Sequence, residues 1–409
     1  MSAGIDGRVL LARLRELGEV GRDARGRLVR LAASDADRAG RDLLARWLQG
    51  AGLEVAVDAI GNLFGIWQAG AGQPVMVGSH IDTVIDAGIY DGCYGVLAGL
   101  AVVEALRAEG LVPARPLAVA AFTNEEGVRF APDMMGSLVH AGGLDLAEAL
   151  ASIGTDGTVL GEELRRIGYA GSMVPGTIRP AAYLELHVEQ GPVLEQDAAA
   201  IGAVADLQGI SWQRLRIEGR ANHAGTTPMA LRQDAGHAAA RIVTGLRALA
   251  EGGTVATVGS LRLEPDAINV IPGAAVLTVD LRDPDEGRLA AAEAALSGLV
   301  AEVAAAEGVA ITTERLARFQ PVRFDPALVA RIEQAAAKRG LPVRRMTSGA
   351  GHDAQMLARI CPSAMIFVPS RDGISHNPAE YTAPEALVAG AEVLLDVVRG
   401  LLGADRGPG

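Results

Sequence analysis

The chain has 409 residues, of which 49% are hydrophobic and 21% are charged, and its formal net charge is −12 at pH 7. This length suits roughly two or three domains with full-sized cores, and the acidic balance argues against a surface that binds nucleic-acid phosphates. The two cysteines, Cys93 and Cys361, are too few for a disulfide framework and form no CxxC spacing, which excludes a thiolate zinc site and indicates a reducing compartment.

The N-terminal residues 1–20 have the pattern of an amphipathic helix and lack the basic-then-apolar order of a secretory signal. No uncharged apolar run reaches the length of about 18 residues that a membrane span needs, and the closest run, Tyr94–Leu106, contains Glu104. We therefore expect a soluble, cytoplasmic protein with neither a membrane nor a nucleic acid as partner.

In the first half, short apolar runs alternate with helical patterns such as Asp91–Glu109, which ends at Gly110. This alternation predicts an α/β domain with a mostly parallel sheet covered on both faces. The expected strands are Ile60–Trp67, Pro74–Ser79, Leu117–Thr123 and Ala182–Leu186.

The middle of the chain has a β-α-β-β-α-β order, which is typical of a small independent domain. After Pro321 a helix, a strand and a closing helix return to the earlier pattern. We predict a discontinuous domain, residues 1–209 and 322–409, interrupted by a lid-like insertion, residues 210–321. The expected elements are Trp212–Glu218, Asp234–Leu249, Thr254–Leu263, Ala274–Arg282, Asp285–Ala306 and Val309–Phe319 in the insertion, followed by Pro326–Arg339, Met365–Pro369 and Pro384–Leu402.

Polar residues gather where the expected strands end. His80 closes one strand, which brings an imidazole to the carboxyl edge of the sheet, where open α/β folds bind ligands. Asp82 could accept the other ring N–H of a ligating His80, and Asp91, at a helix N-terminus, could bridge two ions. A structural histidine explains the His-x-Asp pattern about equally well.

Three more motifs have the same position relative to strands. Glu125 and Glu126 follow an apolar strand, so that Glu126 could bind a cation while Glu125 handles a proton, although a solvated loop is the alternative. His187 closes another strand, and His376 lies in a turn-rich loop after a fourth. Together the motifs predict a two-metal site with nitrogen and oxygen ligands.

The insertion supplies further candidates. His223 lies in a loop too polar for a core histidine, and Asn269 begins a turn-rich segment. Period-two alternation places Arg282 on the polar face of its strand, where it could bind a substrate carboxylate through two hydrogen bonds, with a surface salt bridge as the commoner alternative.

Other motifs receive a structural interpretation. The Gly-rich segment Ser348–Asp353 lacks P-loop spacing, which argues against nucleotide binding. We expect His140 and His237 to be structural, and Cys93 to be a small buried residue rather than a nucleophile.

The strings GSHIDTV, YDG, TNEEG, ELHVEQGPVLE, NHAGTTPM, NVIPG, SGAGHDAQ and GISHNPAEYT occur over nearly the whole chain. In this order they resemble the dinuclear-metal aminoacylase/carboxypeptidase family (peptidase family M20) and, within it, the hydantoinase/carbamoylase amidases. The resemblance implies an α/β, mostly parallel-sheet, two-metal catalytic domain with an inserted ferredoxin-like βαββαβ lid and dimerisation domain, and hence a homodimer.

Site residues carried over from this family are implied by the resemblance. One ion is held by His80, Asp91 and His187, and the other by Asp91, Glu126 and His376, with Asp91 bridging the two and Glu125 as general base. The histidine matching His223 comes from the lid of the second subunit and stabilises the oxyanion. Asn269 and Arg282 match residues that bind the substrate carboxylate, and Gln190 and His352 match substrate-side positions.

The resemblance implies an N-carbamoyl-L-amino-acid hydrolase, which releases the amino acid, ammonia and carbon dioxide from a small ureido acid. The two divalent ions are expected to be zinc, with manganese, cobalt or nickel as alternatives. Allantoate amidohydrolase, ureidoglycolate amidohydrolase and β-ureidopropionase are the alternative activities. A metal-free cysteine amidase using Cys93 and a ureide-binding protein without turnover are the alternatives of a different class.

Overall fold

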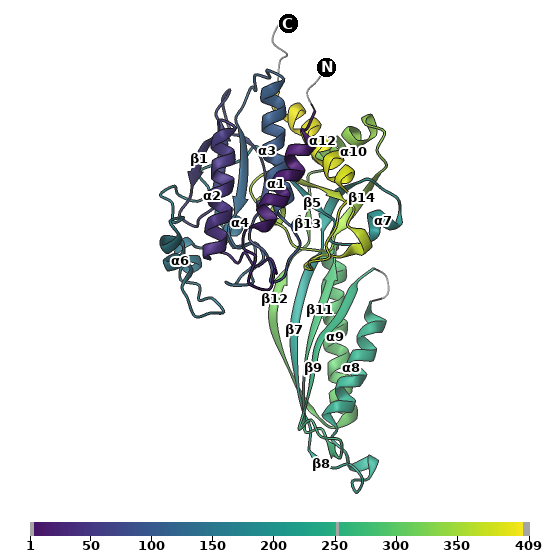
Figure 1. The fold of residues 1–409 in the computed structure, drawn as a ribbon. Coiled ribbons are helices and arrows are strands. Elements are labelled where there is room, and N and C mark those ends of the chain that lie inside the picture. The colour runs from purple at the N-terminus through teal and green to yellow at the C-terminus, as the bar shows by residue number, and fades with distance from the viewer. Residues whose placement is uncertain (1–3, 251–252, 404–409) are drawn as a thin grey trace. The chain divides into compact units, whose positions relative to one another are not determined.

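The computed structural model describes residues 4–250 and 253–403, which form two compact units (Figure 1). The first unit comprises the chain up to Ala205 and again from Phe324, and the second comprises Asp206–Arg323. The sequence prediction had placed these boundaries after residues 209 and 321.

The first unit contains most of a nine-stranded sheet with the order β1-β2-β4-β3-β5-β15-β6-β13, in which β14 also pairs with β6. The central strands β4, β3, β5 and β15 are parallel, whereas β1, β2, β6 and β13 pair antiparallel. The expectation of a mostly parallel sheet is therefore correct for the centre and wrong for the edges, and at one edge the short 58–62 turn reverses the chain between β1 and β2. The bounds are β1 (Glu54–Val57), β2 (Leu63–Trp67), β3 (Val75–His80), β4 (Leu117–Phe122), β5 (Ala182–Val188), β6 (Ile201–Leu207), β13 (Val322–Arg323), β14 (Val343–Ser348) and β15 (Ser363–Val368).

Helices cover this sheet, so that every residue of β3, β4, β5 and β15 is buried. The helix α3 (Cys93–Ala108) packs against β3, β5 and α12, and its uninterrupted apolar sequence reflects burial on nearly all sides. The other helices are α1 (Gly7–Glu19), α2 (Asp35–Gly50), α4 (Met135–His140), α5 (Leu146–Leu150), α6 (Leu160–Ile167), α7 (Val193–Gln196), α10 (Pro326–Lys338), α11 (Asp353–Leu357) and α12 (Pro384–Leu401), with a 3-10 turn η2 (Arg371–Gly373).

The register of the parallel strands brings their carboxyl ends to one edge. His80 lies opposite Phe122, the last residue of β4, and His187 lies opposite Phe367 of β15. The motifs that follow these strands therefore meet at the same edge of the sheet.

The second unit is a four-stranded antiparallel sheet, with the order β12-β7-β11-β9, and two helices. Its elements follow the predicted β-α-β-β-α-β order, and Leu215, Leu277 and Val279 pack in the core that the helices cover. The bounds are β7 (Gly209–Glu218), α8 (Ala235–Leu249), β9 (Val255–Glu264), β11 (Ala274–Asp283), α9 (Glu286–Glu307) and β12 (Ala310–Phe319), with a ribbon of β8 (Asn222–His223) and β10 (Val270–Ile271) and a 3-10 turn η1 (Met229–Leu231).

Among the described residues, one helix, α9, is both long enough and apolar enough to cross a membrane, judged by length and composition alone. Leu289, Leu296 and Val303 on this helix are buried in the core of the second unit. Its hydropathy is consistent with a helix that has one face in a core and is otherwise rich in alanine.

Candidate metal centre

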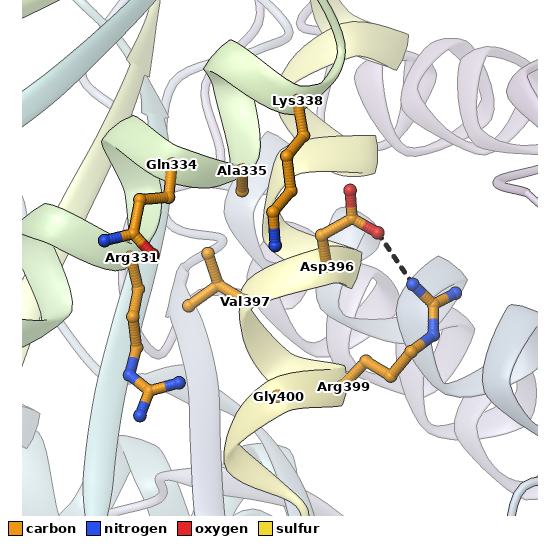
Figure 2. A pocket seen from close by; sticks show the side chains of 8 residues that line it. All are labelled: Arg331, Gln334, Ala335, Lys338, Asp396, Val397, Arg399 and Gly400. Atoms are coloured by element: carbon orange, nitrogen blue, oxygen red, sulfur yellow. Dashed lines mark hydrogen bonds and ion pairs between the residues drawn. The ribbon is translucent and has the colours of Figure 1, made fainter. Parts of the chain in front are cut away.

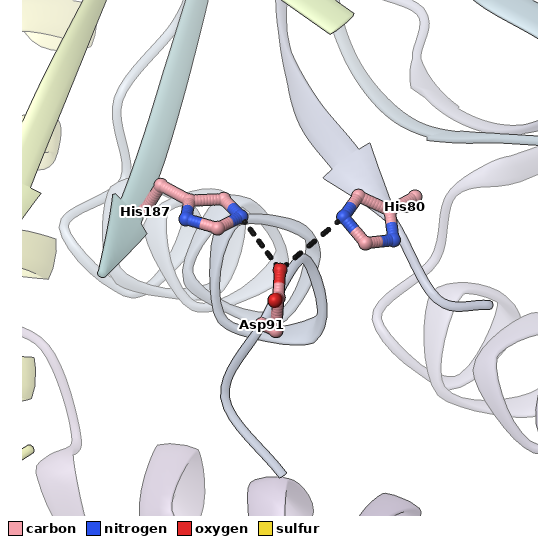
Figure 3. Close-up of side chains that lie close together, drawn as sticks. All are labelled: His80, Asp91 and His187. Atoms are coloured by element: carbon pink, nitrogen blue, oxygen red, sulfur yellow. Dashed lines mark ion pairs between the residues drawn. The ribbon is translucent and has the colours of Figure 1, made fainter. Parts of the chain in front are cut away.

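Asp91 lies at the centre of the converging side chains. One of its carboxylate oxygens, Oδ1, is 3.2 Å from Nε2 of His187 and 3.6 Å from Nε2 of His80, and Figure 3 shows both rings turned toward it. The other oxygen, Oδ2, is 3.2 Å from Nε2 of His376. A carboxylate with imidazole nitrogens beside each oxygen is arranged to bridge two cations.

Two of the histidine rings are oriented by backbone carbonyls. Nδ1 of His80 is 3.0 Å from the carbonyl oxygen of Asp82, and Nδ1 of His187 is 2.9 Å from that of Val188. Because a carbonyl can only accept, Nδ1 carries the proton when either ring is neutral, and Nε2 then offers its lone pair to a cation. The Gly92 N–H donates to Nε2 of His187 at 3.0 Å, which is consistent with this tautomer.

The role expected for the Asp82 side chain was wrong. Its nearest oxygen is 3.9 Å from Nδ1 of His80, and the backbone carbonyl of the same residue holds the ring instead. The Asp82 carboxylate accepts the backbone N–H groups of Glu125 at 3.2 Å and Glu126 at 3.3 Å. It therefore orients the loop that bears the two glutamates.

The two glutamates are not on a solvated loop. Glu125 is 8% exposed, and its Oε2 lies 3.5 Å from Nε2 of His80. Oε2 of Glu126 lies 3.4 Å from Nε2 of His376, while its buried Oε1 has no hydrogen-bond partner among the described residues. An acceptor buried without a donor is costly, and a cation would satisfy it.

The charges at the site shift one another's pKa values. Burial, followed by repulsion from Asp91, raises the pKa of Glu126 to about 8, and burial raises the pKa of Glu125 well above its ordinary value. Burial also acts to raise the pKa of Asp91, but hydrogen bonds with His187, His376 and His80 hold it well below its usual range. The hydrogen bond to Asp91 raises the pKa of His376 to about 9.

This donor set fits two divalent ions. His80, Asp91 and His187 have ligand atoms within 4.8 Å of one another, and so do Asp91, Glu126 and His376. Imidazole and carboxylate donors without a thiolate suit zinc, manganese, cobalt and nickel alike. The raised pKa values mean that Glu126 and His376 hold protons in the absence of a cation, and bound cations would displace these protons.

Gln190 and His352 also border the centre. Gln190 donates from Nε2 to Oδ2 of Asp91 at 2.9 Å and to Oγ of Ser375 at 3.2 Å, so it contacts the bridging carboxylate directly. The ring of His352 lies 4.6 Å from that of His187, and its buried Nε2 has no partner among the described residues. Burial lowers the pKa of His352 well below its ordinary value and keeps the ring neutral.

A third group of potential ligands, Glu185, His187 and His352, shares His187 with the first set and is also buried. The Glu185 carboxylate accepts hydrogen bonds from Oγ of Ser79 and from the Ala354 N–H, both at 2.7 Å. Because Glu185 is already satisfied and His187 faces Asp91, we interpret this group as support for the centre.

Three predicted residues belong to the second unit. His223 and Asn269 are exposed and close together, since the carbonyl of Asn269 accepts the Ala224 N–H at 3.0 Å. Nδ1 of His223 accepts the N–H groups of Gly225 at 3.0 Å and Thr226 at 3.3 Å, so the neutral ring carries its proton on Nε2.

Arg282 lies near the end of strand β11 that is farther from His223 and Asn269. Ala274 begins the strand next to the β8–β10 ribbon, and the eight steps along the strand from Ala274 to Arg282 span about 26 Å at the rise of an extended strand. Arg282 makes the surface salt bridge that was the alternative, at 2.9 Å from Asp280. Within a single chain, Asn269 and Arg282 are therefore too far apart to bind the same substrate carboxylate.

The residues assigned to structure have identifiable partners. Nε2 of His140 is 3.2 Å from the carbonyl of Ile178, and burial lowers its pKa to about 4. Cys93 is buried, and burial raises the pKa of its thiol, which argues against a nucleophile. Nδ1 of His237 lies 3.0 Å from Oε2 of Glu307.

A cavity of about 330 Å³ between α10 and α12 shares no residue with the centre (Figure 2). Arg399 at its edge is paired with Asp396 at 2.6 Å. Its lining offers no imidazole, thiol or hydroxyl group, and consists of Arg331, Gln334, Ala335, Lys338, Asp396, Val397, Arg399 and Gly400.

Known proteins are similar to this chain over nearly its whole length. Residues 76–400 match peptidase family M20/M25/M40. The chain is 41% identical to the N-carbamoyl-L-amino acid amidohydrolase of Geobacillus stearothermophilus, covering 96% of this chain and 98% of that protein. It is 34% identical to the allantoate amidohydrolase of Bacillus subtilis (strain 168), covering 85% and 86%. The solved structure of a hydantoinase/carbamoylase family amidase from Burkholderia multivorans superimposes with a TM-score of 0.94 at 43% identity, covering 97% of this chain and 98% of that chain.

Proposed function

The chain belongs to peptidase family M20/M25/M40, and from this premise we propose that it hydrolyses the ureido C–N bond of N-carbamoyl-L-amino acids. The observation that carries the proposal is the position of Asp91, between His80 and His187 on one side and His376 with Glu126 on the other. The relatives named as carbamoyl amino acid amidohydrolases support the choice of substrate class.

The residues of the centre divide into ligands and a base. His80, Asp91 and His187 would hold one cation, and Asp91, Glu126 and His376 the other. When bound, two such cations polarise a carbonyl oxygen and lower the pKa of a water molecule.

Glu125 is the residue that moves protons. Its carboxylate is buried beside the cluster without belonging to either ligand set. It would take a proton from the attacking water and pass it to the leaving nitrogen. The nearby positive charge of bound cations would lower its raised pKa into the range that a general base needs. His352, whose buried Nε2 has no hydrogen-bond partner among the described residues, would hydrogen-bond the substrate.

The second unit supports a homodimer. A small ureido acid is much shorter than the roughly 26 Å that separate the His223 end of strand β11 from Arg282. We therefore propose that a complete site takes His223 and Asn269 from one subunit and Arg282 from the other. Exposed apolar side chains near His223, namely Met229, Leu231 and Ile268, would provide contact area for the partner.

Mixing two inactive variants tests this arrangement. His223→Ala and Glu125→Gln subunits, unfolded together and refolded, would form heterodimers with one intact site if His223 acts across the interface. For a twofold dimer with random pairing, about a quarter of wild-type activity is expected. No recovery in a mixture that chromatography shows to be dimeric would contradict the proposal.

The substrate is tested by measuring ammonia release from N-carbamoyl-L-amino acids, allantoate, ureidoglycolate and ureidopropionate. We expect the highest kcat/KM with a carbamoyl-L-amino acid. Allantoate hydrolysis is the second candidate because of the Bacillus subtilis relative, and selective turnover of allantoate would establish it instead. Elemental analysis of the same preparation tests for two divalent ions per chain, zinc being the first expectation. The free cysteines support our proposal of a reducing, cytoplasmic location.

A further inference from the structure

Glu380 lies in the loop after β15, and its side chain is buried. Its carboxylate contacts two segments that carry proposed ligands, one ending in Asp91 and the other containing His376. One of its oxygens, Oε2, accepts the backbone N–H groups of Tyr90 at 2.9 Å and Asp91 at 3.4 Å. The other, Oε1, accepts a hydrogen bond from Oγ of Ser375 at 3.3 Å. Only 7% of Glu380 is exposed.

The packing around Glu380 leaves little freedom. A Cβ atom on Gly88 would lie 2.2 Å from Oε2 of Glu380, so the approach requires a glycine at that position. The carboxylate thus lies directly against the segment that ends in Asp91.

Ser375 extends the connection to the bridging ligand itself. Its Oγ lies 3.4 Å from Oδ2 of Asp91 and 3.2 Å from Nε2 of Gln190, which also donates to Oδ2 of Asp91. Ser375 immediately precedes His376, whose backbone has a φ of +52°. Glu380 therefore contacts the backbone of Asp91 directly and, through Ser375, holds the segment that carries His376.

The other two histidines are supported differently. His80 is the last residue of β3 and His187 lies within β5, and each ring is held by a carbonyl of its own segment. Loss of Glu380 should therefore disturb the Asp91–Glu126–His376 set more than the His80–Asp91–His187 set.

We propose that Glu380 is a positioning residue for the second cation, acting by holding Asp91 and His376 in register. This inference rests on the proposed two-cation centre. The contribution is geometric: what matters is a side chain long enough to reach both the Tyr90–Asp91 backbone and Ser375. A glutamine keeps that reach, since its oxygen can accept the backbone N–H groups while its NH₂ donates to Ser375. An aspartate keeps the charge but is one methylene too short.

The test compares Glu380→Gln, Glu380→Asp and Glu380→Ala with wild type by elemental analysis, metal titration and thermal unfolding with and without added zinc or manganese. We expect wild type and Glu380→Gln to bind two ions. In the other two variants, affinity for one ion should fall by about 10- to 100-fold, with a smaller metal-induced rise in Tm. Glu392→Ala is the matched control, since Glu392 accepts the Ile5 N–H at 2.7 Å and pairs with Arg339 at 2.9 Å, neither of which is a proposed ligand, and it should keep both ions.

Two results would overturn the inference. One is binding of two ions with wild-type affinity by folded Glu380→Asp or Glu380→Ala. The other is rescue by aspartate but not by glutamine, which would show that charge matters rather than reach. If Glu380→Ala does not fold, the Asp and Gln variants still decide the question. Failure of wild-type protein to bind two ions would instead refute the proposed centre.

Discussion

The exchange Glu125→Gln tests the division of labour between the adjacent glutamates. Gln has the shape of Glu but cannot accept a proton, and Glu125 belongs to neither potential ligand set. Removing a general base typically slows a reaction about 10²- to 10⁴-fold, so a loss of about 10³-fold, or about 4 kcal/mol in activation free energy, is expected in kcat. Because burial already raises the pKa of Glu125, the neutral amide should be tolerated without loss of stability.

The matched comparison is Glu126→Gln, which makes the same change one residue later. Oε2 of Glu126 lies 3.4 Å from Nε2 of His376, within a potential ligand set, so this variant should lose affinity for one ion as well as activity. The assay is ammonia release under saturating substrate together with metal content of the same samples. Near-normal kcat in Glu125→Gln, or loss of metal by both variants alike, would refute the assigned roles.

Three further outcomes are expected. Dialysis against a chelator should abolish turnover and readdition of metal should restore it, while Cys93→Ser should remain active; the reverse pattern in the same ammonia assay would indicate a thiol mechanism. Arg282→Ala should chiefly raise KM for carboxylate-bearing substrates, and an unchanged KM would argue against carboxylate binding there. Burial lowers the pKa of His140 from 6.5 to about 4 in the folded state, so the buried ring is neutral. The free energy of unfolding should therefore be highest above pH 6.5 and should decrease as the pH falls toward 4. Urea unfolding between these pH values should show this loss, of at most about 3 kcal/mol, and His140→Asn should abolish it; an identical pH dependence in both proteins would contradict the assignment.

The elements that the sequence predicted correctly are those that depend on the local pattern of apolar residues. Continuous apolar runs identified β3, β4 and β5, and parallel strands necessarily bring His80, Glu125 and His187 to one edge. Buried strands are recognisable because both of their faces are apolar, whatever their neighbours are. The helix α2 was missed although Ser34, whose side chain accepts the Asp37 N–H, marks its start.

The sequence could not reveal contacts made between distant segments. His80 and Asp82 are two residues apart, but whether the carbonyl or the carboxylate holds the ring depends on the loop that carries Glu125. Glu380 lies 289 residues from Asp91, and a glutamate in a turn-rich loop is usually solvated. The separation between Asn269 and Arg282 was in principle available, because the length of strand β11 follows from its residue count.

The two ligand sets differ in how strictly the fold determines them. Gly92, with a φ of +63°, is required next to Asp91 because a Cβ there would lie 2.4 Å from the His80 ring. His80 and His187 are thus held by strands, carbonyls and close packing. Glu126 and His376 instead depend on loops, and on contacts such as those of Asp82 and Ser375. The first set is consequently the more preorganised, so that residues outside the ligand shell have more influence on the second.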